Sequence, residues 1–203
     1  MNTPSGAGLR ERKKQATRQA LSWAALRLAV ERGLDNVLVE DIAAAAEVSP
    51  RTFNNYFSSK AEAIASRHLD RVEGLAATLR EQPAAAPLWD AITDATVARF
   101  DGGAPDPTWA QGVRLVTSEP SLVAEFLKAD ARGEEAVAMA VAARVGVDSA
   151  DDPYPHLVAG AVGVCLRVAM AQWTRADPPA PLGALLRSAI AQVAAGLPDP
   201  ADH

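Results

Sequence analysis

The chain has 203 residues, a net charge of −5, 49% hydrophobic residues and a single cysteine. One cysteine excludes an intramolecular disulfide, and the longest apolar stretch, Leu157 to Leu166, is too short to span a bilayer. The alanine-rich, aromatic-poor composition, without long alternating β-branched runs, predicts an all-α protein. The polar segment from Met1 to Gly8 shows no secretory signal, so we expect a cytoplasmic protein with no membrane partner.

In chain order, residues 1–9 are predicted to form a disordered arm, followed by a first helix from Arg10 to Arg32. Gly33 ends this helix and suits a left-handed cap. Two short helices joined by a tight turn occupy residues 39–57. A long helix then runs from Ser59 to Arg80, with Ser59 and Glu62 as its capping box.

Proline and glycine clusters separate the remaining predicted helices, which bring the total to about nine: 88–100, 108–118, 121–145, 155–175 and 181–195. We place the domain boundary near residue 60. Residues 10–60 then form a three-helix domain with a helix-turn-helix, and residues 61–197 form a C-terminal helical bundle. Residues 198–203 form a tail.

The segment from Val39 to Lys60 is the most informative part of the chain. Ser49 and Pro50 are favourable at the start of a helix, as N-cap and first residue. At about 100° per residue, Phe53 and Phe57 share one apolar face of that helix. Polar residues occupy the opposite side: Arg51, Thr52, Asn54 and Asn55. Such a helix suits a DNA major groove, and an amphipathic surface helix with solvated polar residues is the alternative.

The distribution of charge along the chain favours the DNA interpretation. Residues 1–60 hold nine basic and six acidic residues, a net charge of +3. The other 143 residues hold eleven basic and nineteen acidic ones, a net charge of −8. Positive charge is therefore concentrated beside the candidate recognition helix, where it can attract DNA phosphates.

Residues 10–60 resemble the DNA-binding domain of the tetracycline-repressor (TetR) family of bacterial regulators. The matching features are the basic first helix with Ala29-Val30-Glu31-Arg32-Gly33-Leu34, then Val39-x-Asp41-Ile42-Ala43, then Val48-Ser49-x-x-Thr52-Phe53-x-x-Tyr56-Phe57-x-x-Lys60. We expect Arg51, Thr52, Asn54 and Asn55 to meet base edges of a double-stranded operator, and Tyr56 and Lys60 to meet phosphates.

Two residues depart from the family pattern. Glu47 stands where members often have a glycine, in a turn that tends to need a positive φ, at a cost on the order of 1 kcal/mol for a non-glycine residue. Leu38 stands where a threonine N-cap is common, so the second helix lacks a side-chain acceptor. Both departures predict a less stable second helix.

The C-terminal half shows little chemistry. His68, His156 and His203 have no partners at metal-ligand spacing, and we find no nucleophile elbow, phosphate loop or dinucleotide glycine pattern. We therefore expect no enzyme activity, no metal and no cofactor. Cys165 fits a small core residue, with a redox-sensing thiol as the alternative.

A cavity between the C-terminal helices could hold a small molecule, because helix bundles commonly bind ligands there. The candidate lining residues are Trp89, Phe100, Trp109, Phe126, Met139, Met170 and Trp173, with Arg114 and Arg167 for an anionic group. The alternatives are an ordinary core for the apolar residues, and salt bridges or solvent-facing positions for the arginines. This half also contains Arg114-Leu115-Val116-x-x-Glu119-Pro120-x-Leu122, then Ala143-Arg144-Val145-Gly146-Val147 with an acidic loop from Asp148 to Asp152. In these segments it resembles the subgroup typified by the mycofactocin-system regulator, which implies acyl-CoA-like ligands.

The last two predicted helices carry broad apolar faces that suit a homodimer interface, the role that the equivalent helices have in the TetR family. The candidate contacts are Leu157, Ala161, Val164, Val168, Leu182, Leu186, Ile190 and Val193. DNA half-sites also require a two-fold protein.

Together these features predict a ligand-responsive DNA-binding transcriptional regulator, a repressor that a small apolar effector releases from a near-palindromic operator. The alternative is an α-helical small-molecule-binding protein or enzyme with an incidental helix-turn-helix. The sequence by itself does not distinguish a repressor from an activator.

Overall fold

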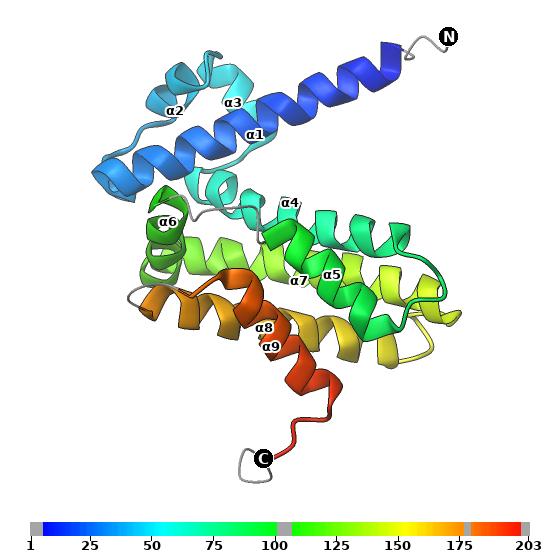
Figure 1. Cartoon of the computed structure of the whole chain (residues 1–203). Helices are drawn as coiled ribbons and strands as arrows, with labels where there is room; N and C mark the ends of the chain where they lie inside the picture. The colour runs from blue at the N-terminus through cyan, green and yellow to red at the C-terminus, as the bar shows by residue number, and fades with distance from the viewer. Residues whose placement is uncertain (1–5, 101–106, 177–179, 200–203) are drawn as a thin grey trace. The chain divides into compact units, whose positions relative to one another are not determined.

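The computed structural model describes residues 6–100, 107–176 and 180–199. Within these ranges the chain forms helices and no strand, as the composition predicts (Figure 1). The elements are α1 (Gly6–Arg32), a short 3-10 helix η1 (Leu34–Asn36), α2 (Val39–Ala45), α3 (Pro50–Tyr56), α4 (Lys60–Glu81), α5 (Leu88–Phe100), α6 (Pro107–Ser118), α7 (Pro120–Val145), α8 (Tyr154–Arg175) and α9 (Leu182–Ala194). Most predicted helix ends agree within a residue or two.

The differences lie at the N-terminus. Residues 6–9 belong to α1 instead of a disordered arm, and residues 1–5 lie outside the described ranges. Gly33 ends α1 with a positive φ of 79°, but its ψ of 144° is not that of the predicted left-handed cap. η1, which follows at once, was not predicted.

The chain divides into two compact units. Unit 1 comprises residues up to 68 together with 107–126, and unit 2 comprises residues 69–106 and 127 onward. α4 and α7 therefore contribute residues to both units. The predicted domain boundary near residue 60 stays a prediction.

Unit 1 has a core in which α1 packs against α2 and α6, and α2 packs against α3. Leu21, Ile42 and Phe53 are fully buried there. These residues come from α1, α2 and α3, so the helix-turn-helix is held to α1 by continuous apolar packing. Each such buried side chain contributes roughly 1.5–3 kcal/mol.

In unit 2, α9 packs against α8 and α5. Arg144, near the end of α7, donates hydrogen bonds to the carbonyls of Gln82, Pro83 and Ala86, at 3.3, 2.6 and 2.7 Å. One guanidinium thus satisfies three backbone acceptors of the α4–α5 connection. These bonds tie the connection to α7.

By length and composition, α8 is the one described helix that could cross a membrane, with a mean hydropathy of 1.4 over its most apolar window. The expectation that no segment is long enough to span a bilayer considered only the uninterrupted apolar stretch, which stops before Arg167, whereas the whole of α8 is longer. Core helices of globular proteins pass the same test. In unit 2, α8 buries Val158, Val162, Leu166 and Trp173 against its neighbours.

Candidate functional site

α3 begins as the sequence predicts. The Ser49 hydroxyl accepts a hydrogen bond from the Thr52 backbone N–H at 3.1 Å, and Pro50 occupies the first turn. Phe53 and Phe57 are buried, with ring centroids 5.7 Å apart. The N-cap and the aromatic pair therefore fix both the start and the inward face of this short helix.

The predicted base-reading side chains lie on the outward side of α3. Arg51, Asn54 and Asn55 are exposed, whereas Thr52 is half-buried. The Thr52 hydroxyl lies 2.9 Å from the Ser49 hydroxyl, so it is partly engaged in capping the helix. Tyr56 is half-buried, and its ring centroid lies 6.4 Å from that of Phe57.

Lys60 has a structural role that the sequence did not reveal. Its Nζ donates hydrogen bonds to the carbonyls of Leu34 and Val37, at 2.7 and 2.8 Å. An ammonium has three N–H donors, and these two bonds hold η1 and the entry to α2 against the start of α4. Contact of Lys60 with a phosphate stays a prediction, now for the remaining donor.

Both departures in the helix-turn-helix have visible consequences. Glu47 adopts a φ of 55°, which confirms the positive value expected in this turn. The Leu38 side chain offers no cap, but the Asp41 carboxylate accepts the Leu38 N–H at 3.0 Å and lies 3.8 Å from the Arg32 guanidinium. Asp41 thus restores part of the missing N-terminal interaction of α2.

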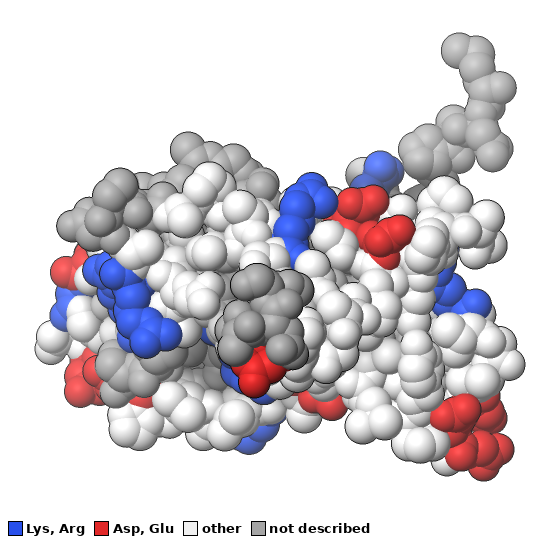
Figure 2. Space-filling model, turned by 60° about the horizontal axis from the view of Figure 1, so that its bottom comes forward, with Lys and Arg blue, Asp and Glu red and all other residues white. Residues whose placement is uncertain are grey.

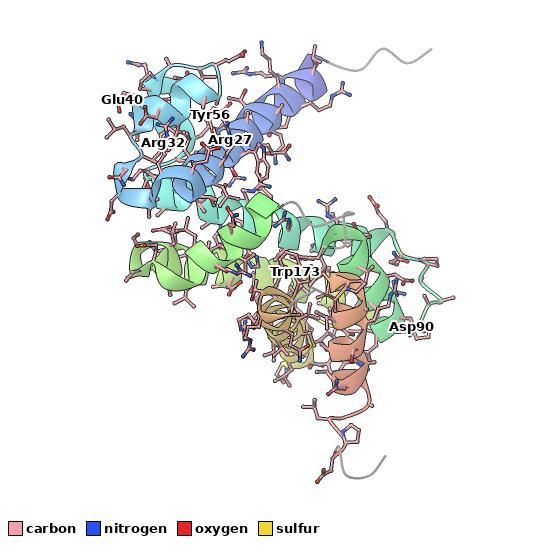
Figure 3. The ribbon with its side chains drawn as sticks, turned by 60° about the vertical axis from the view of Figure 1, so that its left-hand side comes forward. Arg27, Arg32, Glu40, Tyr56, Asp90 and Trp173 are labelled. Carbon is pink, nitrogen blue, oxygen red and sulfur yellow. The ribbon has the colours of Figure 1, made fainter. Side chains whose placement is uncertain are left out.

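The candidate effector residues divide between the two units. In unit 2, Phe100 and Trp173 are buried, Trp89 and Met170 are half-buried, and Trp173 lies among the helices (Figure 3). In unit 1, Phe126 stacks on His68 with ring centroids 4.7 Å apart. Phe126 therefore has an aromatic partner within its own unit.

Met139 was wrongly predicted to line an apolar cavity, because 53% of it is exposed on α7. Its neighbours Ala138, Ala140 and Val141 are the buried residues of this part of α7. Arg114 and Arg167 are also exposed. The side chain of Trp109 lies outside the described part of the structure.

Sequence reasoning missed Thr96. This residue is fully buried in α5, and its hydroxyl has no hydrogen-bond partner among the described residues. A signal was present, because Ile92, Thr96 and Phe100 share one helical stripe at i, i+4 and i+8. An unsatisfied buried hydroxyl costs roughly 1–3 kcal/mol, so Thr96 is a candidate contact for a polar ligand group.

Cys165 is buried in α8, as its apolar neighbours predicted. Burial raises the pKa of its thiol, which keeps the sulfur protonated and unreactive near neutral pH. This environment disfavours the redox-sensing alternative.

An apolar stripe runs along the exposed side of α8. It consists of Leu157, Ala161, Val164 and Val168, which recur every three or four residues. Leu157 is 69% exposed, and Val164 and Val168 are each 45% exposed. α8 and α9 lie at the bottom of the view in Figure 1, and Figure 2 turns this bottom face forward. Residues other than Lys, Arg, Asp and Glu, drawn in white, cover most of the described surface in Figure 2. This α8 stripe suits the predicted dimer contact.

The predicted contacts on α9 need correction. Leu182, Leu186 and Ile190 are buried within unit 2, because α9 turns its apolar face toward α8 and α5 of the same chain. They are core residues, not interface residues. Val193 is half-buried and can still contribute to the interface at the edge of α9.

Comparisons with known proteins decide the family. The family described as "Bacterial regulatory proteins, tetR family" matches residues 23–65, and "MftR C-terminal domain" matches residues 86–198, more than half of the chain. The chain belongs to the TetR family. As a TetR-family member it is a DNA-binding regulator of transcription, as the helix-turn-helix predicted.

The HTH-type transcriptional regulator TcmR of Streptomyces glaucescens is similar to this TetR-family chain. The two are 36% identical over 184 residues, 87% of this chain and 81% of that protein. Two solved structures share the fold. The fatty acid degradation regulator FadR of Bacillus halodurans has a TM-score of 0.57 at 18% identity, covering 89% of this chain and 96% of that one. A transcriptional regulator from Rhodococcus sp. Rha1 has a TM-score of 0.51 at 19% identity, covering 90% and 99%.

Proposed function

We propose that this protein is a homodimeric, ligand-responsive repressor that acts in the cytoplasm. Each subunit places α3 in a major groove of a near-palindromic operator. The observation that carries the proposal is the two-sided character of α3, whose outward side exposes Arg51, Asn54 and Asn55 while Phe53 is buried. Arginine pairs with guanine O6 and N7, and asparagine pairs with adenine N6 and N7.

Base readout by α3 predicts a specific loss of operator affinity. Arg51→Ala and Asn55→Ala should each weaken operator binding by about 1–3 kcal/mol and change binding to a scrambled duplex little. Fluorescence anisotropy with a duplex selected from random DNA by the wild-type protein measures both affinities. Gln192→Ala, which removes an exposed amide from α9, is the control. Equal losses on both duplexes would show that these residues position the protein without reading bases.

A dimer is required by the operator geometry. Recognition helices that enter successive major grooves on one side of DNA must lie roughly 34 Å apart, the length of one helical turn. The α8 stripe supports such a dimer, because an exposed apolar stripe is best covered by the same stripe of a second copy.

We further propose a largely apolar effector that binds unit 2, with an acyl chain as the first candidate and its CoA thioester as the first form to test. The apolar interior of unit 2 and the match to the MftR C-terminal domain support this choice. The Thr96 hydroxyl supports one hydrogen bond to a polar group of the ligand.

Effector binding would act through α4. This helix is continuous from Lys60 in unit 1 to Glu81 in unit 2. A ligand releases DNA only if it binds the released state more tightly than the DNA-bound state, and each tenfold change requires about 1.4 kcal/mol.

A panel of fatty acids, acyl-CoAs and hydrophobic antibiotics should contain a compound that raises the melting temperature and releases the selected operator. Thr96→Val keeps the side-chain shape and removes the hydroxyl. It should raise the stability of the unliganded protein, since it removes an unsatisfied group. It should also weaken binding of the active compound by roughly 1 kcal/mol. Operator release by sugars or metal ions alone would contradict the apolar effector and leave the repressor assignment intact.

A further inference from the structure

The N-terminal half of α1 is a basic segment that lies outside the family match. The match begins at residue 23, whereas α1 begins at Gly6. Residues 8–16 are exposed, and the buried core of unit 1 starts at Leu21. This end of α1 extends past α2 and α3 (Figure 1). We call residues 8–20 the basic extension, because it holds five cations and one acid: Arg10, Arg12, Lys13, Lys14, Arg18 and Glu11.

Three of these cations line up on one side of α1. At about 100° per residue, Arg10, Lys14 and Arg18 fall within an arc of about 80°. The same arc holds Leu21 and Ala25, which are buried in unit 1. The three cations therefore continue a side of α1 that is buried within unit 1.

Arg18 connects this row of cations to the recognition helix. Its guanidinium carbon lies 5.4 Å from the ring centroid of Phe57, the residue that caps the C-terminus of α3. The row thus begins beside one end of α3. From there, Lys14 and Arg10 follow at one-turn intervals into solvent, about 6 and 12 Å along the helix axis.

Helix stability does not explain this arrangement. Like charges at i and i+4, such as Arg10 with Lys14 and Lys14 with Arg18, destabilise an isolated helix because they repel each other along one side of it. The first turn of α1 holds no acidic residue that would favour the helix N-terminus. A polyanion beside α3 would attract these cations and offset their mutual repulsion.

We propose that the row formed by Arg10, Lys14 and Arg18 within the basic extension is a second DNA contact, which binds phosphates that flank the groove occupied by α3 and reads no sequence. The inference rests on the proposed function, since α3 must lie on DNA for the extension to reach it. A row about 12 Å long covers roughly three or four base pairs at 3.4 Å per step. The row therefore lengthens the stretch of DNA that each subunit contacts, at either the outer or the inner edge of its half-site.

The test compares two charge-matched double variants of the full chain. Arg10→Gln with Lys14→Gln removes cations from the row. Arg12→Gln with Arg27→Gln removes two cations from the opposite side of α1, where both are exposed. Affinities are measured against salt concentration on the operator selected from random DNA and on a scrambled duplex of the same length, and circular dichroism checks helix content.

The row variant should weaken binding to both duplexes by the same factor. The slope of log affinity against log salt should fall by about 0.9 for each phosphate that is no longer neutralised, or roughly 3.6 for four such phosphates in a dimer. The control should keep the wild-type slope. If the row binds outside the half-site, trimming the selected operator by about four base pairs at each end should reduce the difference in affinity between the wild type and the row variant.

Equal slopes for the row variant and the control would overturn the proposal while operator binding by the wild type upheld the proposed function. Loss of operator specificity without a change of slope would also overturn it, because the row would then read bases. Failure of the wild-type protein to select any duplex would instead overturn the proposed function. Binding of the wild type, but not the row variant, to vesicles rich in phosphatidylserine, with equal DNA slopes, would assign the row to a membrane surface.

Discussion

Val164→Glu should convert the protein to monomers and weaken operator binding by roughly 10²–10⁴-fold, the advantage that a second linked binding site supplies. Val164 lies in the middle of the exposed α8 stripe, so glutamate there places a charge in the apolar contact between two copies without entering the core of either. Light scattering at micromolar concentration measures the oligomeric state, and anisotropy with the selected operator measures affinity.

Val145→Glu is the matched control, because Val145 is 39% exposed near the end of α7 and outside the α8 stripe. It should leave both the dimer and operator affinity unchanged. A Val164→Glu dimer with wild-type affinity would exclude the stripe as the interface. Ile190→Glu cannot serve in this experiment, because Ile190 is a core residue of unit 2 and a buried, unpaired charge there should unfold the protein.

Lys60→Met should lower the free energy of unfolding by roughly 2–4 kcal/mol, because it removes two hydrogen bonds from a charged donor and leaves the carbonyls of Leu34 and Val37 without it. Methionine retains the apolar stem. DNA affinity should fall on all sequences alike as the entry to α2 loosens. Urea denaturation measures stability, and Lys14→Met, which removes an exposed lysine, is the control for this stability measurement alone.

The two roles of Lys60 are separable by salt. A purely electrostatic phosphate contact predicts unchanged stability and a salt slope smaller by about 0.9 per subunit. The structural role predicts a loss of stability that persists at high salt, where surface electrostatics are screened. Unchanged unfolding of Lys60→Met in about 1 M salt would contradict the structural role.

The helical architecture was predictable because its boundaries have local causes. Ser49-Pro50 starts α3, Gly33 ends α1, and proline-rich segments separate α4 from α5. The start of α1 was missed because Gly6 and Gly8 have low helix propensity and the first turn has no acidic residue. η1 was missed because a lysine from a distant part of the chain holds it, and no local pattern shows such a bond.

The outward side of α3 was also predictable, since a seven-residue helix with two buried phenylalanines has only one side left for Arg51 and Asn55. Apolar periodicity in the C-terminal half was less decisive. It shows that a side of α9 is buried but not which partner buries it, so Ile190 and Val164 looked equivalent in the sequence. Thr96 lay in a buried stripe, but only packing shows that its hydroxyl has no partner among the described residues.

Because Cys165 is buried, conformational changes of this regulator can be measured with labels placed at other positions. A protonated thiol inside α8 is protected from maleimide and disulfide reagents while the helix stays packed. The native chain therefore serves directly as the parent for spectroscopic labelling, with one cysteine introduced at an exposed α2 position such as Glu40 (Figure 3). Pulsed dipolar spectroscopy between two such labels in a dimer would report the distance between the two helix-turn-helix segments before and after effector is added.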